Sequence, residues 1–253
     1  MITVNGVTKK YGNKKVIDDV SVQIQKGKIT SFIGPNGAGK STLLSMISRI
    51  LKRDEGEILL EGHDVMNSKS NELAKKISIL KQTNHLTMRL TIRELVSFGR
   101  FPYSQGKLKK EDIAYIDEAI AYMELEDMQH KYIDELSGGQ RQRAYIAMVL
   151  AQNTDYILLD EPLNNLDMKH SVQIMKVLRR LVDELGKTII IVIHDINFAS
   201  CYSDYIVALK NGQLIKHGAT SEIIKEDVLL DVYDMHIPIQ TIDGNKIGVY
   251  FSA

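Results

Sequence analysis

Residues Gly34 to Ser41 read GPNGAGKS, the most informative segment of the chain for its fold. It matches the pattern Gly, four residues, Gly, Lys, then Ser or Thr. It lies between a buried strand pattern, Ile29 to Ile33, and a helical pattern that begins near Lys40. Glycines let the backbone curl until successive N–H groups face inward, and with a helix N-terminus these groups form a cradle for phosphate. The stretch therefore predicts a strand, a phosphate-binding loop and a helix. The competing interpretation is an ordinary Gly-rich turn.

The side chains of this loop predict a nucleotide site. Lys40 is expected to reach the β- and γ-phosphates, and Ser41 to offer its hydroxyl to Mg²⁺, a cation that prefers oxygen ligands. The residues expected to contact the nucleotide here are Gly34, Pro35, Asn36, Gly37, Ala38, Gly39, Lys40, Ser41 and Thr42. ATP and Mg²⁺ are the cofactors that this motif implies.

Outward from the loop, strand and helix patterns alternate. The predicted strands are Val16 to Ile24, Ile29 to Ile33, Ile77 to Leu80, Tyr156 to Asp160, Thr188 to Ile193, Tyr205 to Leu209 and Leu214 to His217. The predicted helices are Ser41 to Ile50, Ile92 to Phe98, Asp112 to Met123, Gln140 to Ala151 and Lys169 to Leu185. This alternation predicts a parallel α/β core. Together with the phosphate loop, the fold class expected is α/β, a P-loop NTPase core with a predominantly parallel sheet and an antiparallel β segment.

One part of the chain departs from the alternation. Residues 84–135 contain helical patterns without a convincing strand, so we predict an inserted helical subdomain there. Residues 1–83 and 136–253 then form the ATP-binding core, with an N-terminal β part at 1–33 and the phosphate loop at 34–41.

Composition narrows the function classes. Lys plus Arg and Asp plus Glu both total 32, so no net positive charge attracts nucleic acid, and we expect none as a partner. The single Cys201 fits a reducing compartment, and the polar start MITVNGVTKK lacks the apolar centre of a signal peptide. No run approaches the roughly 20 apolar residues that span a bilayer. We therefore expect a cytoplasmic protein whose membrane step belongs to partner chains.

Two acids follow a buried strand pattern. The apolar run from Tyr156 ends in Asp160 and Glu161, and the carboxyl ends of strands are where α/β sheets bind ligands. Asp160 is expected to hold Mg²⁺ through water, and Glu161 to orient and deprotonate the water that attacks the γ-phosphate. Pro162 ends the strand. By itself such a pair is more often a solvated strand end, but beside the phosphate loop the catalytic interpretation is favoured.

A second motif carries a family resemblance. Leu136 to Gln140 reads LSGGQ and precedes the Asp160 strand, as does the signature of ABC transporter ATPases, which this chain resembles. Ser137 also has the position of a helix N-cap. In that family the signature of one subunit completes the ATP site of the other, so the resemblance implies a homodimer. Ser137, Gly138, Gly139 and Gln140 would then contact the partner's nucleotide.

The same resemblance assigns further positions. Tyr11 matches the aromatic residue that stacks on adenine, and Gln82 the glutamine that contacts Mg²⁺ and the attacking water. His194 matches the switch histidine that reaches the γ-phosphate, and Asp167 the aspartate that crosses the dimer interface. For Tyr11 the alternative is a tyrosine packed at a strand end. A lone strand-end histidine is also more often structural.

Within the family, the chain looks most like the ATPases of bacterial importers of iron complexes, including siderophores and haem, and of the related cobalamin systems. The similarity lies in Ser97 to Tyr103, Arg143 to Gln152 and Leu166 to His170. It implies an integral membrane permease and an extracytoplasmic substrate-binding protein as partners, with this chain peripheral on the cytoplasmic face of the membrane.

Three residues of the expected insert have two interpretations. Arg100, Phe101 and Tyr103 either line or support a groove for the permease, or form a polar turn closed by Pro102 with aromatics packed beneath it.

Two further features concern the subfamily and the tail. Leu163, Asn164 and Asn165 stand where most relatives carry Thr or Ser after Pro162. Residues 227–253 contain the sequence DGNK between apolar segments and predict a terminal hairpin.

Rival functions differ in what they require. An exporter or another nutrient importer would share every ATP motif. A non-transport ABC ATPase acting on DNA or the ribosome usually has two ATPase units, a long coiled coil or zinc cysteines, and this sequence has none of them. A nucleotide kinase would lack LSGGQ. The sequence thus favours the ATPase of an iron-chelate importer.

Overall fold

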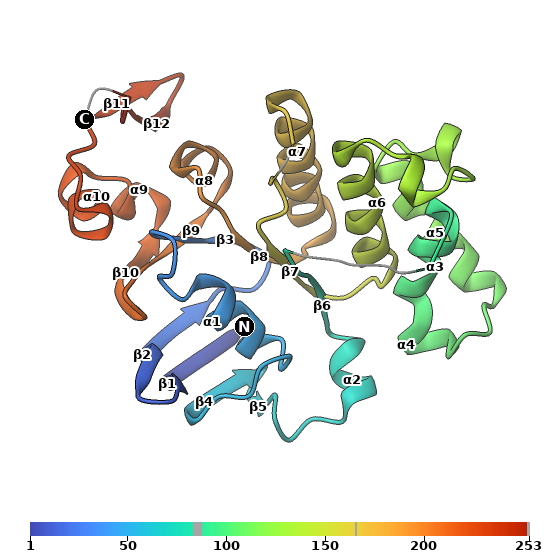
Figure 1. The fold of residues 1–253 in the computed structure, drawn as a ribbon, viewed down its shortest axis with the longest axis horizontal. Coiled ribbons are helices and arrows are strands. Elements are labelled where there is room, and N and C mark those ends of the chain that lie inside the picture. Colours follow the sequence, from blue (N-terminus) through green and yellow to red (C-terminus); the bar gives the residue numbers. More distant parts are fainter. Residues whose placement is uncertain (83–87, 165, 252–253) are drawn as a thin grey trace. The chain divides into compact units, whose positions relative to one another are not determined.

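The computed structural model describes residues 1–82, 88–164 and 166–251. Its contacts divide the chain into two compact units, one of Met1–Ser68 with Thr188–Ala253 and one of Lys69–Lys187 (Figure 1).

The first unit contains a mostly parallel sheet in the order β10-β9-β3-β8. Its strands are β3 (Ile29–Ile33), β8 (Thr188–Val192), β9 (Tyr205–Lys210) and β10 (Gln213–Ala219). Strands β8 and β9 run parallel to β3, and β10 is antiparallel to β9. Every residue of β3 and β8 is buried, as expected for parallel strands covered on both faces. The helices α1 (Lys40–Ile47) and α8 (Ile196–Tyr202) pack against these strands.

A second, antiparallel sheet in this unit has the order β2-β1-β4-β5. Its strands are β1 (Ile2–Tyr11), β2 (Lys14–Ile24), β4 (Glu55–Leu60) and β5 (His63–Asp64). The predicted strand Val16 to Ile24 lies within β2, whereas β1 and β4 were not predicted as strands. In β1 the register shifts between Val4 and Lys10 break the regular alternation that marks a half-buried strand.

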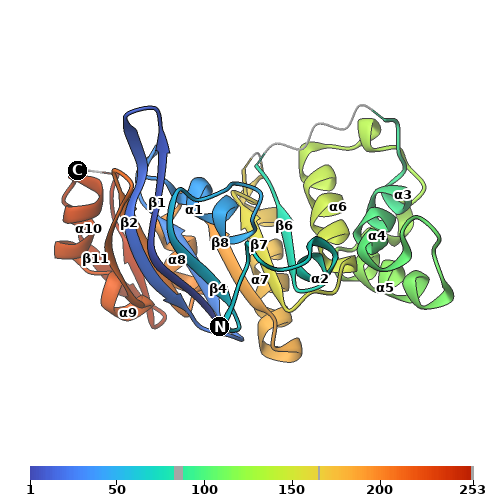
Figure 2. The same ribbon diagram turned by 90° about the horizontal axis from the view of Figure 1, so that it is seen from below.

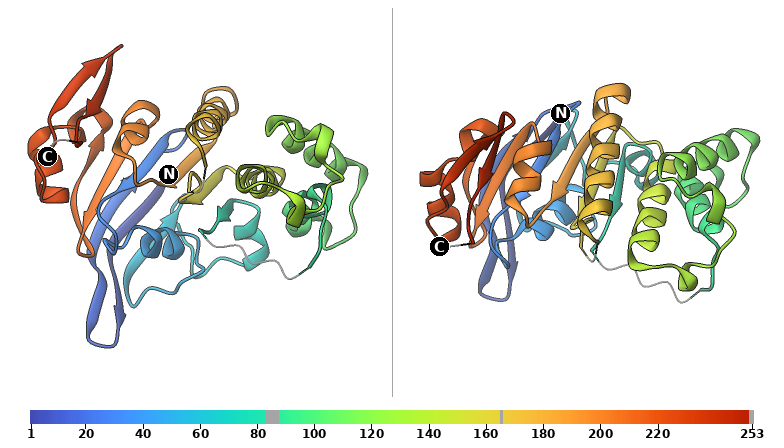
Figure 3. Two further views of the ribbon diagram at one scale, coloured as in Figure 1. Left: turned by 45° about the horizontal axis from the view of Figure 1, so that its top comes forward. Right: turned by 90° about the horizontal axis from the view of Figure 1, so that it is seen from above.

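The C-terminal part of the first unit contains α9 (Thr220–Ile223), α10 (Glu226–Tyr233), β11 (Ile239–Ile242) and β12 (Asn245–Gly248). Strands β11 and β12 pair as an antiparallel hairpin, which confirms the predicted terminal hairpin. Helix α10 was not predicted. The hairpin lies along α8, as Figure 3 shows at the red end of the chain.

The second unit holds two parallel strands and most of the long helices. The strands are β6 (Ile77–Leu80) and β7 (Tyr156–Asp160), both as predicted. The α-helices are α2 (Ser70–Ala74), α3 (Ile92–Ser97), α4 (Phe101–Ser104), α5 (Lys110–Tyr122), α6 (Gly138–Ala151) and α7 (Met168–Leu185). Short 3₁₀ turns lie at Phe98–Arg100, Glu126–Met128 and Ile133–Glu135. Helices α3, α5 and α6 pack on one another (Figure 2).

The architecture is the predicted α/β fold with a mostly parallel sheet, an antiparallel sheet and a group of helices. The predicted insert at 84–135 falls inside the second unit, and its first residues, 84–87, lie outside the described part of the chain. The boundaries of this inserted subdomain remain a prediction. Among the described residues, no helix is both long and apolar enough to cross a bilayer.

Candidate nucleotide site

The phosphate loop joins β3 to α1, as the sequence predicts. Its glycines have positive φ angles, 138° at Gly34, 77° at Gly37 and 101° at Gly39, which is the N-cap of α1. At Gly39 a Cβ atom would lie 2.5 Å from Ile17 Cδ1 and 2.9 Å from the Val16 carbonyl oxygen. Glycine is therefore required at this position by backbone angle and by space.

Lys40 lies inside this loop. Its side chain is buried, and Nζ donates hydrogen bonds to the carbonyl oxygens of Gly34 at 2.7 Å and Pro35 at 3.0 Å. Ser41 and Thr42 follow in the first turn of α1. A buried ammonium group held by the loop and a helix N-terminus are both attractive to an anion.

His194 shares an edge of the sheet with this loop. It follows β8, which pairs in parallel with β3 through Phe32 and Val192, so both strands end at the same side. The next residue, Asp195, caps α8 and accepts hydrogen bonds from the backbone N–H groups of Asn197 and Phe198 at 2.8 and 3.3 Å. The His194 side chain is exposed.

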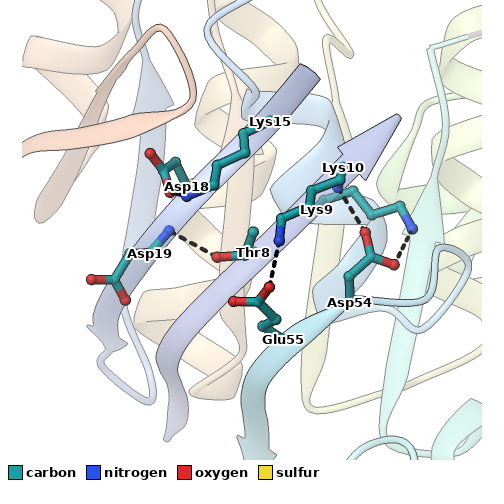
Figure 4. A network of polar contacts seen from close by, with 8 residues as sticks. All are labelled: Thr8, Lys9, Lys10, Lys15, Asp18, Asp19, Asp54 and Glu55. Carbon is teal, nitrogen blue, oxygen red and sulfur yellow. Dashed lines mark hydrogen bonds and ion pairs between the residues drawn. The ribbon is translucent and has the colours of Figure 1, made fainter. Parts of the chain in front are cut away.

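Tyr11 ends β1, and the residue is 56% exposed, as stacking on a base requires. Figure 4 shows the polar network that holds this strand end. Lys9 Nζ lies 5.5 Å from the Tyr11 ring centre and donates to Asp54 Oδ1 at 2.9 Å, while the Lys10 backbone N–H donates to Asp54 Oδ2 at 2.7 Å. The Lys10 N–H and the Lys9 ammonium hold the pKa of Asp54 below its usual value.

The second unit brings Gln82 and Glu161 together. The parallel pairing of β6 with β7 places the ends of the strands side by side, and Gln82 Nε2 donates to Glu161 Oε2 at 2.6 Å. The Asn164 amide donates to the same oxygen. Asp160 ends β7 and is buried. Two amide donors therefore orient the Glu161 carboxylate.

The sequence assigned no catalytic role to Asn164, which only differs from the Thr or Ser of most relatives. Its contact with Glu161 gives it a place beside the expected catalytic base. Asn165 lies outside the described residues.

The signature motif opens α6. Ser137 is the N-cap, its hydroxyl accepts from the Gln140 backbone N–H at 3.3 Å, and Gln140 Oε1 accepts from the Ser137 N–H at 3.1 Å. This capping box satisfies amides that the helix leaves unpaired. The cap proposed for Ser137 is confirmed.

The signature also lies beside the start of α7, which the sequence did not indicate. A Cβ on Gly139 would be 3.5 Å from Leu166 Cδ2 and 3.7 Å from the His170 ring. Asp167 is the N-cap of α7, and its Oδ1 accepts from the His170 N–H at 2.9 Å and lies 2.8 Å from His170 Nδ1. These contacts with His170 lower the pKa of Asp167.

Arg100 supports the helical surface from beneath and does not line it. Its side chain is buried, with Nε 2.9 Å from Asp112 Oδ1 and a second nitrogen 2.8 Å from the Ala151 carbonyl oxygen. Phe101 is 59% exposed. The polar turn closed by Pro102 is wrong, because Pro102 lies in the first turn of helix α4, where its fixed φ and missing N–H are tolerated.

The expected site residues therefore fall into two groups. The first unit holds Tyr11, the loop Gly34 to Ser41 with Thr42, and His194. The second holds Gln82, Asp160, Glu161, the signature residues Ser137 to Gln140, and Asp167.

Comparison with known proteins identifies the family to which the chain belongs. The model of the ABC transporter family matches residues 17–164. The chain is 68% identical over 252 residues to the petrobactin import ATP-binding protein of Bacillus subtilis, covering 100% of both chains. It is 43% identical over 233 residues to the iron(3+)-hydroxamate import ATP-binding protein of the same organism, covering 91% of this chain and 87% of the relative.

Solved structures agree. The dimeric structure of a bacterial ABC transporter cassette superposes with a TM-score of 0.78 at 34% identity, over 87% of this chain and 99% of that one. A subunit of a metal-chelate type ABC transporter, 23% identical, has the same fold with a TM-score of 0.84 over 99% and 98% of the chains. This chain therefore belongs to the ABC transporter family, as an ATP-binding subunit that hydrolyses ATP.

Proposed function

We propose that this chain energises the import of an iron–siderophore complex, with ferric petrobactin as the first candidate, through a separate permease. The observation that carries the proposal is the 68% identity to a petrobactin import ATP-binding protein over the full length of both chains. Hydroxamate and enterobactin import proteins are more distant, at 43% and 37% identity.

In the first unit, the chain binds the nucleotide at two points. Tyr11 stacks on the adenine, and the amides of Gly34 to Ser41 hold the phosphates. Lys40 then exchanges the carbonyl oxygens of Gly34 and Pro35 for β- and γ-phosphate oxygens. His194 donates to the γ-phosphate from the neighbouring strand end.

In the second unit, Glu161 is the general base. The Gln82 and Asn164 amides orient the carboxylate, which accepts a hydrogen bond from water and then its proton as the water attacks the γ-phosphate. Gln82 is a second contact to that water.

The residues expected to hold Mg²⁺ fit its chemistry. Ser41, Gln82 and Asp160 offer a hydroxyl, an amide oxygen and a carboxylate, which are the hard oxygen donors that Mg²⁺ prefers. When bound, Mg²⁺ neutralises charge on the β- and γ-phosphate oxygens.

The working form is a homodimer. Ser137 and the Gly138 and Gly139 amides at the start of α6 present donors to the nucleotide of the partner subunit, together with Gln140, and Asp167 lies in the adjoining loop. ATP then holds the two subunits together, and its hydrolysis releases them. Subunits of this kind work beneath an integral membrane permease, on the cytoplasmic face, with an extracytoplasmic binding protein delivering the substrate.

Transport in a strain lacking this gene tests the cargo. Uptake of radioactive iron should be lost with ferric petrobactin and retained with ferric hydroxamate, haem or an inorganic iron salt. The wild-type gene should restore it, and a gene encoding Glu161→Gln should not. Normal petrobactin uptake in the deletion strain, with a defect confined to haem or cobalamin, would favour the alternative of another importer in the family.

A further inference from the structure

The first residue of the phosphate loop is tied to the far end of the chain. The buried backbone N–H of Gly34 donates a hydrogen bond to the Tyr233 hydroxyl at 3.2 Å, across 199 residues of sequence. A buried amide without a partner is costly, so this hydroxyl meets a requirement of the loop.

Gly34 is also confined from a second direction. A Cβ on Gly34 would lie 2.0 Å from the Leu209 carbonyl oxygen at the end of β9, so the backbone of β9 packs directly against the loop. Lys40 Nζ holds the Gly34 carbonyl oxygen at 2.7 Å. The tyrosine hydroxyl, the strand and the lysine together fix the peptide groups on either side of Gly34.

The same strand end anchors the helix that carries Tyr233. Lys210, the last residue of β9, donates to the Asp231 carbonyl oxygen and to Asp234 Oδ1, both at 2.7 Å, and so closes the C-terminal end of α10. Burial raises the pKa of Tyr233 to about 12, so its hydroxyl stays neutral and remains an acceptor for Gly34 at neutral pH.

The tail also braces the helix that follows His194. Asn197 in α8 exchanges two hydrogen bonds with Gly248, at 3.2 and 2.8 Å, and the Ser200 hydroxyl donates to the Lys246 carbonyl oxygen at 2.6 Å. The C-terminal segment thus contacts the phosphate loop and the helix that follows His194.

We propose that Tyr233 is a positioning residue for ATP binding: its hydroxyl holds the first peptide of the phosphate loop in the conformation that receives the phosphates. The inference rests on the proposed phosphate-binding role of Gly34 to Ser41. It makes the C-terminal segment part of the nucleotide site.

Tyr233→Phe in the full-length protein removes only the hydroxyl. Calorimetric titration should give about 3- to 10-fold weaker binding of both Mg-ATP and inorganic triphosphate, the range of one hydrogen bond. The KM for ATP should rise by a similar factor with kcat unchanged. Lys210→Met, which loosens α10 and keeps the tyrosine, should shift both affinities in the same direction.

Tyr205→Phe is the matched control. It removes a tyrosine hydroxyl at the start of β9, the opposite end of that strand from Leu209, and should leave both affinities unchanged. Wild-type affinity in Tyr233→Phe, or a loss of kcat and thermal stability with KM unchanged, would overturn the positioning role.

Lys40→Ala distinguishes failure of the Tyr233 role from failure of the phosphate-binding role of Gly34 to Ser41. Lost phosphate affinity in Lys40→Ala with normal affinity in Tyr233→Phe would refute the tyrosine alone. Normal affinity in Lys40→Ala would refute the phosphate-binding role as well.

Discussion

Glu161 has a φ of 52°, a left-handed backbone conformation that non-glycine residues adopt rarely. It directly follows the last residue of β7, and its carboxylate accepts from Gln82 and Asn164. Backbone strain of this kind persists where surrounding contacts hold it, and it is frequent at functional sites. The proposed base is therefore held both by its backbone and by its side-chain partners.

Glu161→Gln should keep ATP binding and lower kcat by about 10²- to 10⁴-fold, because the amide retains the shape and cannot accept a proton. Equilibrium binding of ATP and steady-state phosphate release measure the two effects. Glu118→Gln, an identical change at an exposed position of α5, is the control and should hydrolyse ATP normally. Turnover at the wild-type rate in Glu161→Gln would exclude this residue as the base.

Arg100 illustrates a residue whose role is stability. Its ion pair with Asp112 is buried on both sides, with each side chain 5% exposed. Arg100→Met leaves a buried carboxylate without its cation and should lower the free energy of unfolding by about 3–5 kcal/mol in urea denaturation. Arg89→Met breaks an exposed ion pair and should change it little. Equal effects of the two variants would contradict this assignment.

The Asp112 carboxyl should also give the protein an acid-sensitive contact. The Lys109 backbone N–H and the Arg100 guanidinium hold its pKa below the usual value. A carboxyl with a depressed folded-state pKa stabilises the protein above its unfolded pKa, and this contribution is lost as pH falls through the folded value. Asp112→Asn should therefore flatten the fall in stability below about pH 4. Asp127→Asn, at an exposed position, should keep the wild-type pH profile.

Among the secondary-structure elements, the loop between β3 and α1 contains two glycines, Gly34 and Gly37, whose substitution should have different effects on stability. Gly34 has its Cβ direction blocked by the Leu209 backbone, whereas a Cβ on Gly37 would meet nothing within 4 Å. Both have positive φ angles. Position 34 thus requires glycine both for its positive φ angle and for the lack of space, and position 37 requires it for the φ angle alone.

Gly34→Ala should accordingly lower the free energy of unfolding by about 3 kcal/mol or more, since two backbone segments would have to separate. Gly37→Ala should cost about 1 kcal/mol. Thermal or urea unfolding without nucleotide measures both. A Gly34→Ala protein as stable as Gly37→Ala would mean that β9 does not constrain the loop.

At the scale of the whole molecule, the residues proposed for ATP hydrolysis belong to both compact units. The phosphate loop and His194 lie in one unit, and Glu161 with the signature residues lies in the other. The proposed mechanism further assigns the signature to the nucleotide of a partner subunit. Activity should therefore depend on dimerisation as well as on the integrity of each chain.

Mixing two inactive variants tests this dependence. Ser137→Arg disables the signature and Lys40→Ala disables the phosphate loop, so a mixed dimer retains one site made of an intact loop and an intact signature. ATP hydrolysis in the mixture should exceed that of either variant alone. The double variant Lys40→Ala/Ser137→Arg mixed with itself is the control and should stay inactive. A mixture no more active than its components would argue against sites shared between subunits.

The fold class could be predicted from the sequence alone, because strand patterns and loop motifs are formed by residues that are close together in the chain. Strands β3, β6 and β7 coincide with the predicted runs, since each is a short segment rich in Ile, Leu or Phe that ends at Gly or polar residues, and the GPNGAGKS and LSGGQ stretches identify their own loops. Strand β1 and helix α10 were missed because register shifts and short length weaken their periodicity.

Contacts between residues that are far apart in the sequence could be seen only in the tertiary structure. Glu161 meets Gln82 because β6 and β7 pair in parallel across 79 residues, and Gly34 meets Tyr233 across 199. The tertiary structure also placed Arg100 inside the helical group, where its buried side chain supports the surface and does not line it. Periodicity reports which face of an element is buried, whereas a hydrogen-bond partner depends on how the buried faces are assembled.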